Sequence, residues 1–181
     1  MRKVLLLGLT LFGTVALTGC DAISGLFSGE KQYKYDDFKA LLADRKLSFT
    51  ATRATSVLEE NGVKTSVEYT YSALNGEWEG TRKEGGIRLK TLDIVNEVKS
   101  YDILAALADK KVDDIYGFYA KEKSYRITLK VEYKENGVNI RGEAEYKYGE
   151  DGLKTYSHEK KTDLDAVETT EEKETFEYFD K

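Results

Sequence analysis

Proline is absent from this chain of 181 residues, which contains one cysteine, one histidine and one tryptophan. A single thiol cannot form an intrachain disulfide, so the stability of the fold must come from an ordinary core. One histidine and one cysteine are also too few for the usual zinc ligand sets. Since proline is not available to break strands and helices, we expect the Asn-Gly, Asp-Gly and Gly-Gly pairs to mark the turns.

The N-terminus has a positive start, an apolar run and an end of small residues. Arg2 and Lys3 precede the apolar run of residues 4–17, which only Gly and Thr interrupt, and Cys20 follows shortly after. This layout is typical of a secretory signal. The apolar run is also shorter than a transmembrane helix would need. We therefore expect residues 1–19 to be a signal peptide.

The end of this leader, Leu17-Thr18-Gly19-Cys20, resembles the bacterial lipobox, Leu-(Ser/Thr/Ala)-(Gly/Ala)-Cys. The resemblance covers only the leader. It implies that the chain is a bacterial lipoprotein of the cell envelope, with cleavage before Cys20 and diacylglycerol on its sulfur. Such a protein is anchored by lipid to the cell membrane and faces outside the cytoplasm. Residues 20–34 would then be the lipidated N-terminus and a tether.

The charge of the exported part argues against a polyanionic partner. Removal of residues 1–19 takes away Arg2 and Lys3 and no acid, so the formal net charge changes from −5 to −7. An acidic domain is repelled by nucleic acid and by an anionic membrane surface. We therefore expect no nucleic-acid partner, and the membrane contact to depend on the lipid at Cys20.

Hydrophobic periodicity divides the remaining chain into helical and strand segments. Apolar residues at helical spacing predict helices over 35–44 and 92–110 and a second short amphipathic stretch at 112–119. The charged stretch 159–175 predicts a loop or a frayed helix. Alternation between apolar and polar residues predicts strands over 47–58, 63–71, 77–83, 87–91, 125–133, 138–148 and 153–161, with a last strand or docked end at 175–179.

Two passages of the chain share the same order of features. Each has a helix, a strand, a Glu-Asn-Gly-Val turn (60–63 and 135–138) and a strand that contains Tyr-x-Tyr. This order is consistent with two duplicated units, 35–91 and 100–161, although any helix followed by a meander would give a similar pattern. The alternation also predicts one apolar face of the sheet, formed by Ile127, Leu129, Val131, Ile140 and Ala144, with Lys130, Arg141 and Glu143 exposed.

These elements predict one α+β domain over residues 35–181, in which the apolar face of a curved antiparallel sheet, built from meanders, packs against short helices. Two arrangements fit this order. One is a half-barrel closed by helices, similar in layout to the periplasmic lipoprotein carriers and the mycobacterial lipid-binding lipoproteins. The other is a tandem of helix-plus-sheet repeats similar to the β-lactamase inhibitor protein.

The residues provide little support for catalysis or metal binding. His158 has Ser157 beside it and Ser124 elsewhere in the chain, but no Gly-x-Ser-x-Gly context accompanies either serine. Asp163, Asp165 and Glu168 lack the spacing and the central glycine of an EF-hand loop. We therefore expect no enzyme, no metal and no cofactor.

Four tyrosines are candidates for a ligand site. Tyr69, Tyr71, Tyr146 and Tyr148 fall on the apolar faces of their strands, where they either line a half-open cavity or simply pack in the sheet. We expect a membrane-anchored lipoprotein with a non-catalytic binding role for a hydrophobic ligand or lipid. The alternative is a protein-interaction or inhibitor module that uses the charged face of the sheet to bind an envelope protein.

Overall fold

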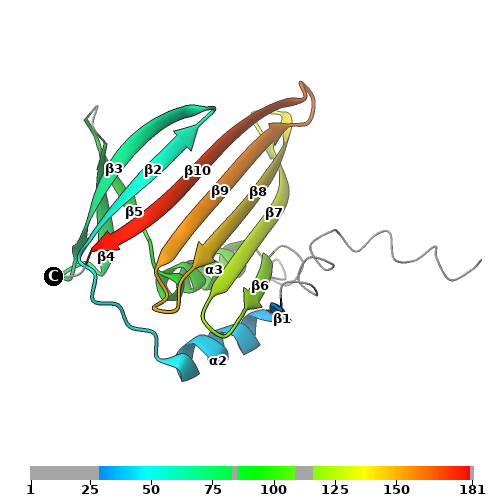
Figure 1. The fold of residues 1–181 in the computed structure, drawn as a ribbon. Helices are drawn as coiled ribbons and strands as arrows, with labels where there is room; N and C mark the ends of the chain where they lie inside the picture. Colours follow the sequence, from blue (N-terminus) through cyan, green and yellow to red (C-terminus); the bar gives the residue numbers. More distant parts are fainter. Residues whose placement is uncertain (1–28, 83–84, 109–115, 180–181) are drawn as a thin grey trace, which may run out of the picture. The chain divides into compact units, whose positions relative to one another are not determined.

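The computed structural model describes residues 29–82, 85–108 and 116–179, and nearly all described elements lie in one compact unit, Gln32–Lys181. The expected signal peptide, Cys20 and most of the tether lie outside the described residues. Within the described ranges, no helix is long and apolar enough to cross a membrane. In chain order (Figure 1), the elements are β1 (Lys31–Tyr33), α2 (Tyr35–Arg45), β2 (Arg53–Glu60), β3 (Val63–Ser72), β4 (Glu77–Arg82), β5 (Ile87–Lys90), α3 (Ile94–Ala108), β6 (Tyr116–Ala120), β7 (Tyr125–Glu135), β8 (Val138–Tyr148), β9 (Lys154–Asp163) and β10 (Glu168–Phe179).

The ten strands form one sheet in the order β1-β6-β7-β8-β9-β10-β2-β3-β4-β5. All pairings from β6 to β5 in this order are antiparallel. The chain therefore builds two meanders, β2 to β5 and β6 to β10. Figure 1 shows β10, the last strand, lying between β9 and β2, so the end of the chain joins the two meanders.

Two Asn-Gly pairs close the β2–β3 and β7–β8 hairpins, as the sequence predicts. Asn61 and Gly62 have φ of 48° and 85°, and Asn136 and Gly137 have φ of 52° and 88°. A tight two-residue hairpin turn needs positive φ at both central residues, which asparagine and glycine adopt most readily. The turns align Glu60 with Val63 and Glu135 with Val138. The two passages thus share a turn geometry, and their origin by duplication stays a prediction.

Helices α2 and α3 pack on one face of the sheet at β6, β7 and β8. The tyrosine at the start of α2, Tyr35, also donates a hydrogen bond of 2.8 Å to the carbonyl of Val98 in α3. We call this side of the sheet the inner face and the opposite side the outer face. The shared cluster contains Phe38 and Leu42 of α2, Ile94, Val98 and Tyr101 of α3, and Phe118, Ile127 and Tyr148 of the sheet.

A second apolar cluster covers the inner face of the first meander. Trp78 on β4 is fully buried and lies against Tyr71 and Tyr178, with ring centroids 5.4 and 5.7 Å apart. Its other buried members come from neighbouring strands and from the segments that lead into them: Ala51, Ala54, Leu58, Val67, Tyr69, Leu92, Leu153 and Phe176. Phe176 of β10 belongs to this cluster, so the last strand is part of the core of the first meander.

The α+β prediction is wrong, although the antiparallel meanders are present. The fold is a ten-stranded sheet accompanied, among the described residues, by helices of only 11 and 15 residues. Residues 116–119, part of the expected short amphipathic stretch, lie in β6, and the charged stretch 159–175 forms the end of β9, a turn and the first part of β10. In the charged stretch, strand pairing outweighs the local sequence pattern. Its charged side chains point alternately to the outer and the inner face, and most of those on the inner face form ion pairs.

The predicted faces of the sheet are correct, but some residues that were expected to be buried are only half-buried. Ile127 and Ile140 are buried and Lys130 is exposed, whereas Arg141 and Glu143 are half-buried beside their ion-pair partners. Three residues expected in the core, Leu129, Val131 and Ala144, are only half-buried. The two helices cover one end of these strands, and the other end leaves an apolar wall partly accessible.

Candidate binding groove

A groove of about 510 Å³ lies on the inner face along β7, β8, β9 and β10. Side chains two residues apart on a strand share a face, so the register of the sheet places two walls beside each other. The apolar wall consists of Leu129, Val131 and Tyr133 on β7 and Gly142, Ala144 and Tyr146 on β8. The polar wall consists of Glu159 and Lys161 on β9, Thr170 and Glu172 on β10, and Glu60 and Asn61 at the β2–β3 turn.

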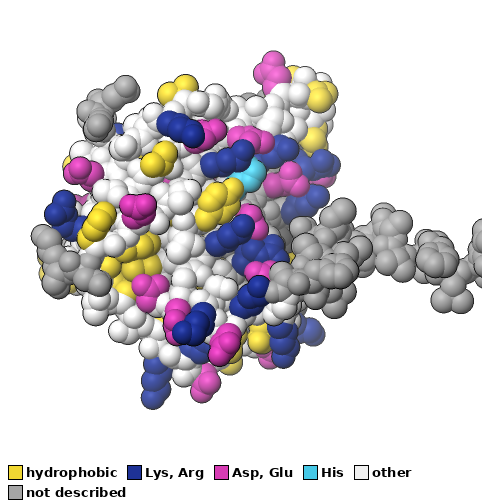
Figure 2. Space-filling model, viewed as in Figure 1, with side chains coloured by type: hydrophobic (Ala, Val, Ile, Leu, Met, Phe, Trp, Pro, Cys, Tyr) yellow, Lys and Arg dark blue, Asp and Glu magenta, His cyan; other side chains and the backbone are white. Residues whose placement is uncertain are grey.

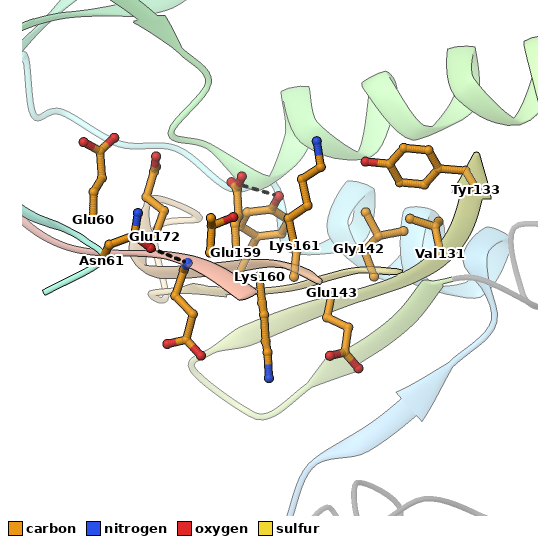
Figure 3. A pocket seen from close by; sticks show the side chains of 15 residues that line it. Glu60, Asn61, Val131, Tyr133, Gly142, Glu143, Glu159, Lys160, Lys161 and Glu172 are labelled. Atoms are coloured by element: carbon orange, nitrogen blue, oxygen red, sulfur yellow. Dashed lines mark hydrogen bonds between the residues drawn. The ribbon is translucent and has the colours of Figure 1, made fainter. Parts of the chain in front are cut away.

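Figure 3 shows how the side chains of this groove divide between the two faces. Glu159, Lys161 and Tyr133 lie on the side of the sheet where α3 runs, whereas Lys160 and Glu143 point to the outer face. Only the first set can contact a molecule in the groove. A glycine also helps to form the hollow, because a Cβ at position 142 would lie 3.1 Å from Cγ2 of Val131.

Most charged groups of the polar wall already have partners of opposite charge. Glu172 pairs with Arg88 at 2.5 Å, and Glu60 pairs with Arg82 at 2.9 Å. The ammonium of Lys161 pairs with a carboxylate oxygen of Glu135. These three ion pairs compensate the charges of Glu172, Glu60 and Lys161.

Glu159 is the exception on this wall. Its carboxylate accepts a hydrogen bond of 3.2 Å from the hydroxyl of Tyr146, and no cationic group of the described residues lies within 4 Å of it. Burial, followed by the charge of Glu159, raises the pKa of the Tyr146 hydroxyl far above its ordinary value of 10. Tyr146 is therefore a neutral hydrogen-bond donor at physiological pH. The buried ammonium of Lys154, which is paired with Glu97, attracts Glu159 only from beyond 4 Å.

A second pocket, of about 320 Å³, lies beside α3 and shares Tyr146 and Glu159 with the groove. In this pocket the buried ammonium of Lys154 pairs with Glu97 of α3 and donates a hydrogen bond of 3.2 Å to the Thr91 carbonyl. Burial raises the pKa of Glu97 despite its partner, and burial lowers the pKa of Lys154. The pair therefore lies in a poorly solvated place, which favours a structural role.

A buried polar network lies where β10 meets β2. The carboxylate of Glu174 is fully buried and accepts hydrogen bonds from Ser56, at 2.5 Å, and from Tyr69 and Lys90. Burial opposes the ionised form, but Lys90 and the two hydroxyls outweigh it, so the pKa of Glu174 lies below its ordinary value. This network joins side chains of β10, β2, β3 and β5 on the inner face, and its Tyr69 also belongs to the Trp78 cluster.

The four candidate tyrosines do not come together in one site. Tyr69 and Tyr148 are about 1% exposed and belong to different core clusters. Tyr71 packs between Phe49 and Trp78, with ring centroids 5.1 and 5.4 Å away. Tyr146 is the one member of this set that lines the groove.

The other residues considered for catalysis or metal binding, His158 and the acidic cluster around Asp163, contact neighbouring side chains or the backbone. His158 lies on the outer face, where its Nε2 is 3.6 Å from Glu171. In the β9–β10 turn, Asp163 accepts hydrogen bonds of 2.8 Å from the backbone N–H groups of Asp165 and Ala166. Among the described residues, no group of three or more histidine, cysteine, aspartate and glutamate side chains is arranged to hold a metal ion.

Sequence reasoning missed the polar wall of the groove. Glu172 falls in the stretch expected to be a loop or frayed helix, and Glu159 and Lys161 lie where that stretch overlaps the predicted strand 153–161. One sequence signal could have shown that the strand predicted at 175–179 begins earlier. Every second residue from position 172 onward lies on the same face: Glu172, Glu174, Phe176 and Tyr178. Comparisons with protein-family models, with curated proteins and with solved structures found no match.

Proposed function

We propose that this chain is a lipid-anchored extracytoplasmic binding protein without a catalytic role, and that the groove binds a ligand with an apolar part. The observation that supports this is the half-buried apolar wall of Leu129, Val131 and Ala144 along a groove of about 510 Å³. Grooves of this size with apolar linings and a few polar groups are typical ligand sites. The lipobox-like leader would hold the groove close to a membrane, where alkyl ligands concentrate.

The proposal can be tested by photolabelling in membranes that contain the full-length protein. An uncharged dodecyl probe with a diazirine and an alkyne handle should label peptides from β7 and β8, because these strands form the apolar wall. Ala144→Trp fills the groove and should reduce this labelling several-fold. Lys130→Trp, which places the same side chain on the outer face, is the matched control. If the folded Ala144→Trp variant is labelled as strongly as the wild type, the proposal is contradicted.

A second candidate function is binding of another envelope protein at the β5 edge of the sheet. Ile87 and Leu89 on this edge strand are 80% and 64% exposed, and unpaired strand edges can accept a further strand. Figure 2 shows the outer face, where charged side chains of both signs are interspersed among several apolar side chains. A photo-crosslinking amino acid at position 89 should then give one discrete adduct, whereas the same group at the exposed Lys64 should give none.

A further inference from the structure

The groove contains one carboxylate that has no ion-pair partner within 4 Å among the described residues. Glu172, Glu60 and Lys161 each have a partner of opposite charge within 4 Å. Among the described residues, Glu159 accepts a side-chain hydrogen bond only from the neutral hydroxyl of Tyr146, and the buried ammonium of Lys154, which attracts it from more than 4 Å away, is paired with Glu97. Most acceptor positions of Glu159 are therefore open to the groove. The groove is therefore apolar along β7 and β8 and negatively charged at one point on β9.

We propose that the groove selects an amphipathic ligand that carries a protonated amine. The amine binds the carboxylate of Glu159, and the alkyl part lies along Leu129 and Val131. This inference rests on the proposed function, because it names the ligand class for the same groove. An ammonium suits this position, since it offers up to three donors to a carboxylate that has one donor at present.

The surroundings of Glu159 decide on which side the amine binds. The pocket beside α3 also reaches Glu159, but the ammonium groups of Lys90 and Lys154 line that pocket and would repel a cation. On the groove side, the nearest lysine of the same wall, Lys161, is held by Glu135. The amine is therefore expected on the groove side, next to the apolar wall.

Three photoactivatable probes with the same dodecyl chain can test this selectivity: an amine, an alcohol and a carboxylic acid. The full-length protein is labelled in membranes at low salt, and the concentration for half-maximal labelling of β7 and β8 is measured for each probe. The amine should require about three- to fivefold less probe than the alcohol, because an ion pair at an exposed carboxylate contributes modestly. The carboxylic acid should require more than the alcohol, and 0.5 M salt should reduce the preference for the amine.

Glu159→Gln keeps the shape of the side chain and removes its charge, so it should abolish the preference for the amine and leave labelling by the alcohol unchanged. Glu143→Gln removes a carboxylate from the outer face of the adjacent strand and should leave the preference intact. Equal labelling by all three probes, or a preference that survives Glu159→Gln, would overturn the amine inference and leave the proposed function standing. Absence of any labelling that depends on Ala144 would overturn both.

Discussion

At the scale of single residues, Glu174 is the most constrained ionisable group among those described. Its fully buried carboxylate accepts hydrogen bonds from Ser56, Tyr69 and Lys90. Glu174→Gln removes the charge and leaves the Lys90 ammonium poorly compensated, so the free energy of unfolding should fall by about 3–5 kcal/mol, as for other broken buried pairs. Urea denaturation measures this change. Glu177→Gln, at an exposed position of the same strand, is the control and should have little effect.

The same residue should contribute to the acid sensitivity of the protein. Because its pKa is lower in the folded chain than the ordinary value of 4.5, its stabilising effect is present above that pH and is lost as the pH falls through the folded pKa. Glu97 acts in the opposite direction, since burial raises its pKa. The informative measurement is therefore the difference in unfolding free energy between wild type and Glu174→Gln, which should shrink below about pH 4.5. A difference that stays constant down to pH 3 would contradict this assignment.

At the scale of elements, one buried ion pair connects α3 to the second meander. Lys154 at the start of β9 is 1% exposed and pairs with Glu97 of α3. Lys154→Met leaves the Glu97 carboxylate buried without its partner, which should cost about 3–5 kcal/mol. The double variant Glu97→Leu/Lys154→Met removes both charges and should recover most of this loss in a urea titration. If the double variant is as unstable as the single one, the ion pair is not the source of the effect.

The strands that were predictable from sequence are those in which turn chemistry and alternation agree. Asn61-Gly62 and Asn136-Gly137 each lie between two alternating runs, and both hairpins form as expected. The strand β10 was not predictable over most of its length, because polar side chains occupy both of its faces there. Glu172 and Glu174 become compatible with the inner face through partners such as Arg88 and Lys90, which are more than 80 residues away in the sequence.

The candidate site was predictable only in part, for the same reason. Tyr146 was identified because it continues the apolar alternation of β8. Glu159 was not identified, since its importance depends on the pairing of β8 with β9 and on the lack, among the described residues, of a cation within 4 Å. Distance along the sequence does not show which carboxylate remains unpaired after folding.

At the scale of the whole described fold, β10 lies between the two meanders, and we expect them to unfold as one cooperative unit. Phe176 and Phe179 lie on the same strand, but Phe176 is 6% exposed on the inner face and Phe179 is 46% exposed. Phe176→Ala should therefore cost about 3–5 kcal/mol, and Phe179→Ala much less. Trp78 fluorescence reports on the first meander and far-ultraviolet circular dichroism on all strands. The two unfolding transitions should coincide in each variant, whereas separated transitions would show that the meanders unfold independently.

Attachment of the protein to a membrane is expected to depend on Cys20, which lies outside the described residues. Each buried acyl CH₂ contributes about 0.8 kcal/mol, so two or three acyl chains anchor a domain firmly. The part after residue 19 has a formal net charge of −7 and gains no attraction from an anionic surface. Cys20→Ala should therefore accumulate as uncleaved precursor without incorporated alkyne-palmitate, detected by gel mobility and fluorescence.

Ser24→Ala is the control for this experiment, because it changes a nearby small side chain and leaves Leu17-Thr18-Gly19-Cys20 intact. It should be cleaved and labelled like the wild type. A Cys20→Ala variant that is still cleaved and still incorporates palmitate would place the lipid elsewhere and remove the basis for a lipobox. In that case the groove would have to bind its amphipathic ligand without an acyl anchor that keeps the protein close to the membrane.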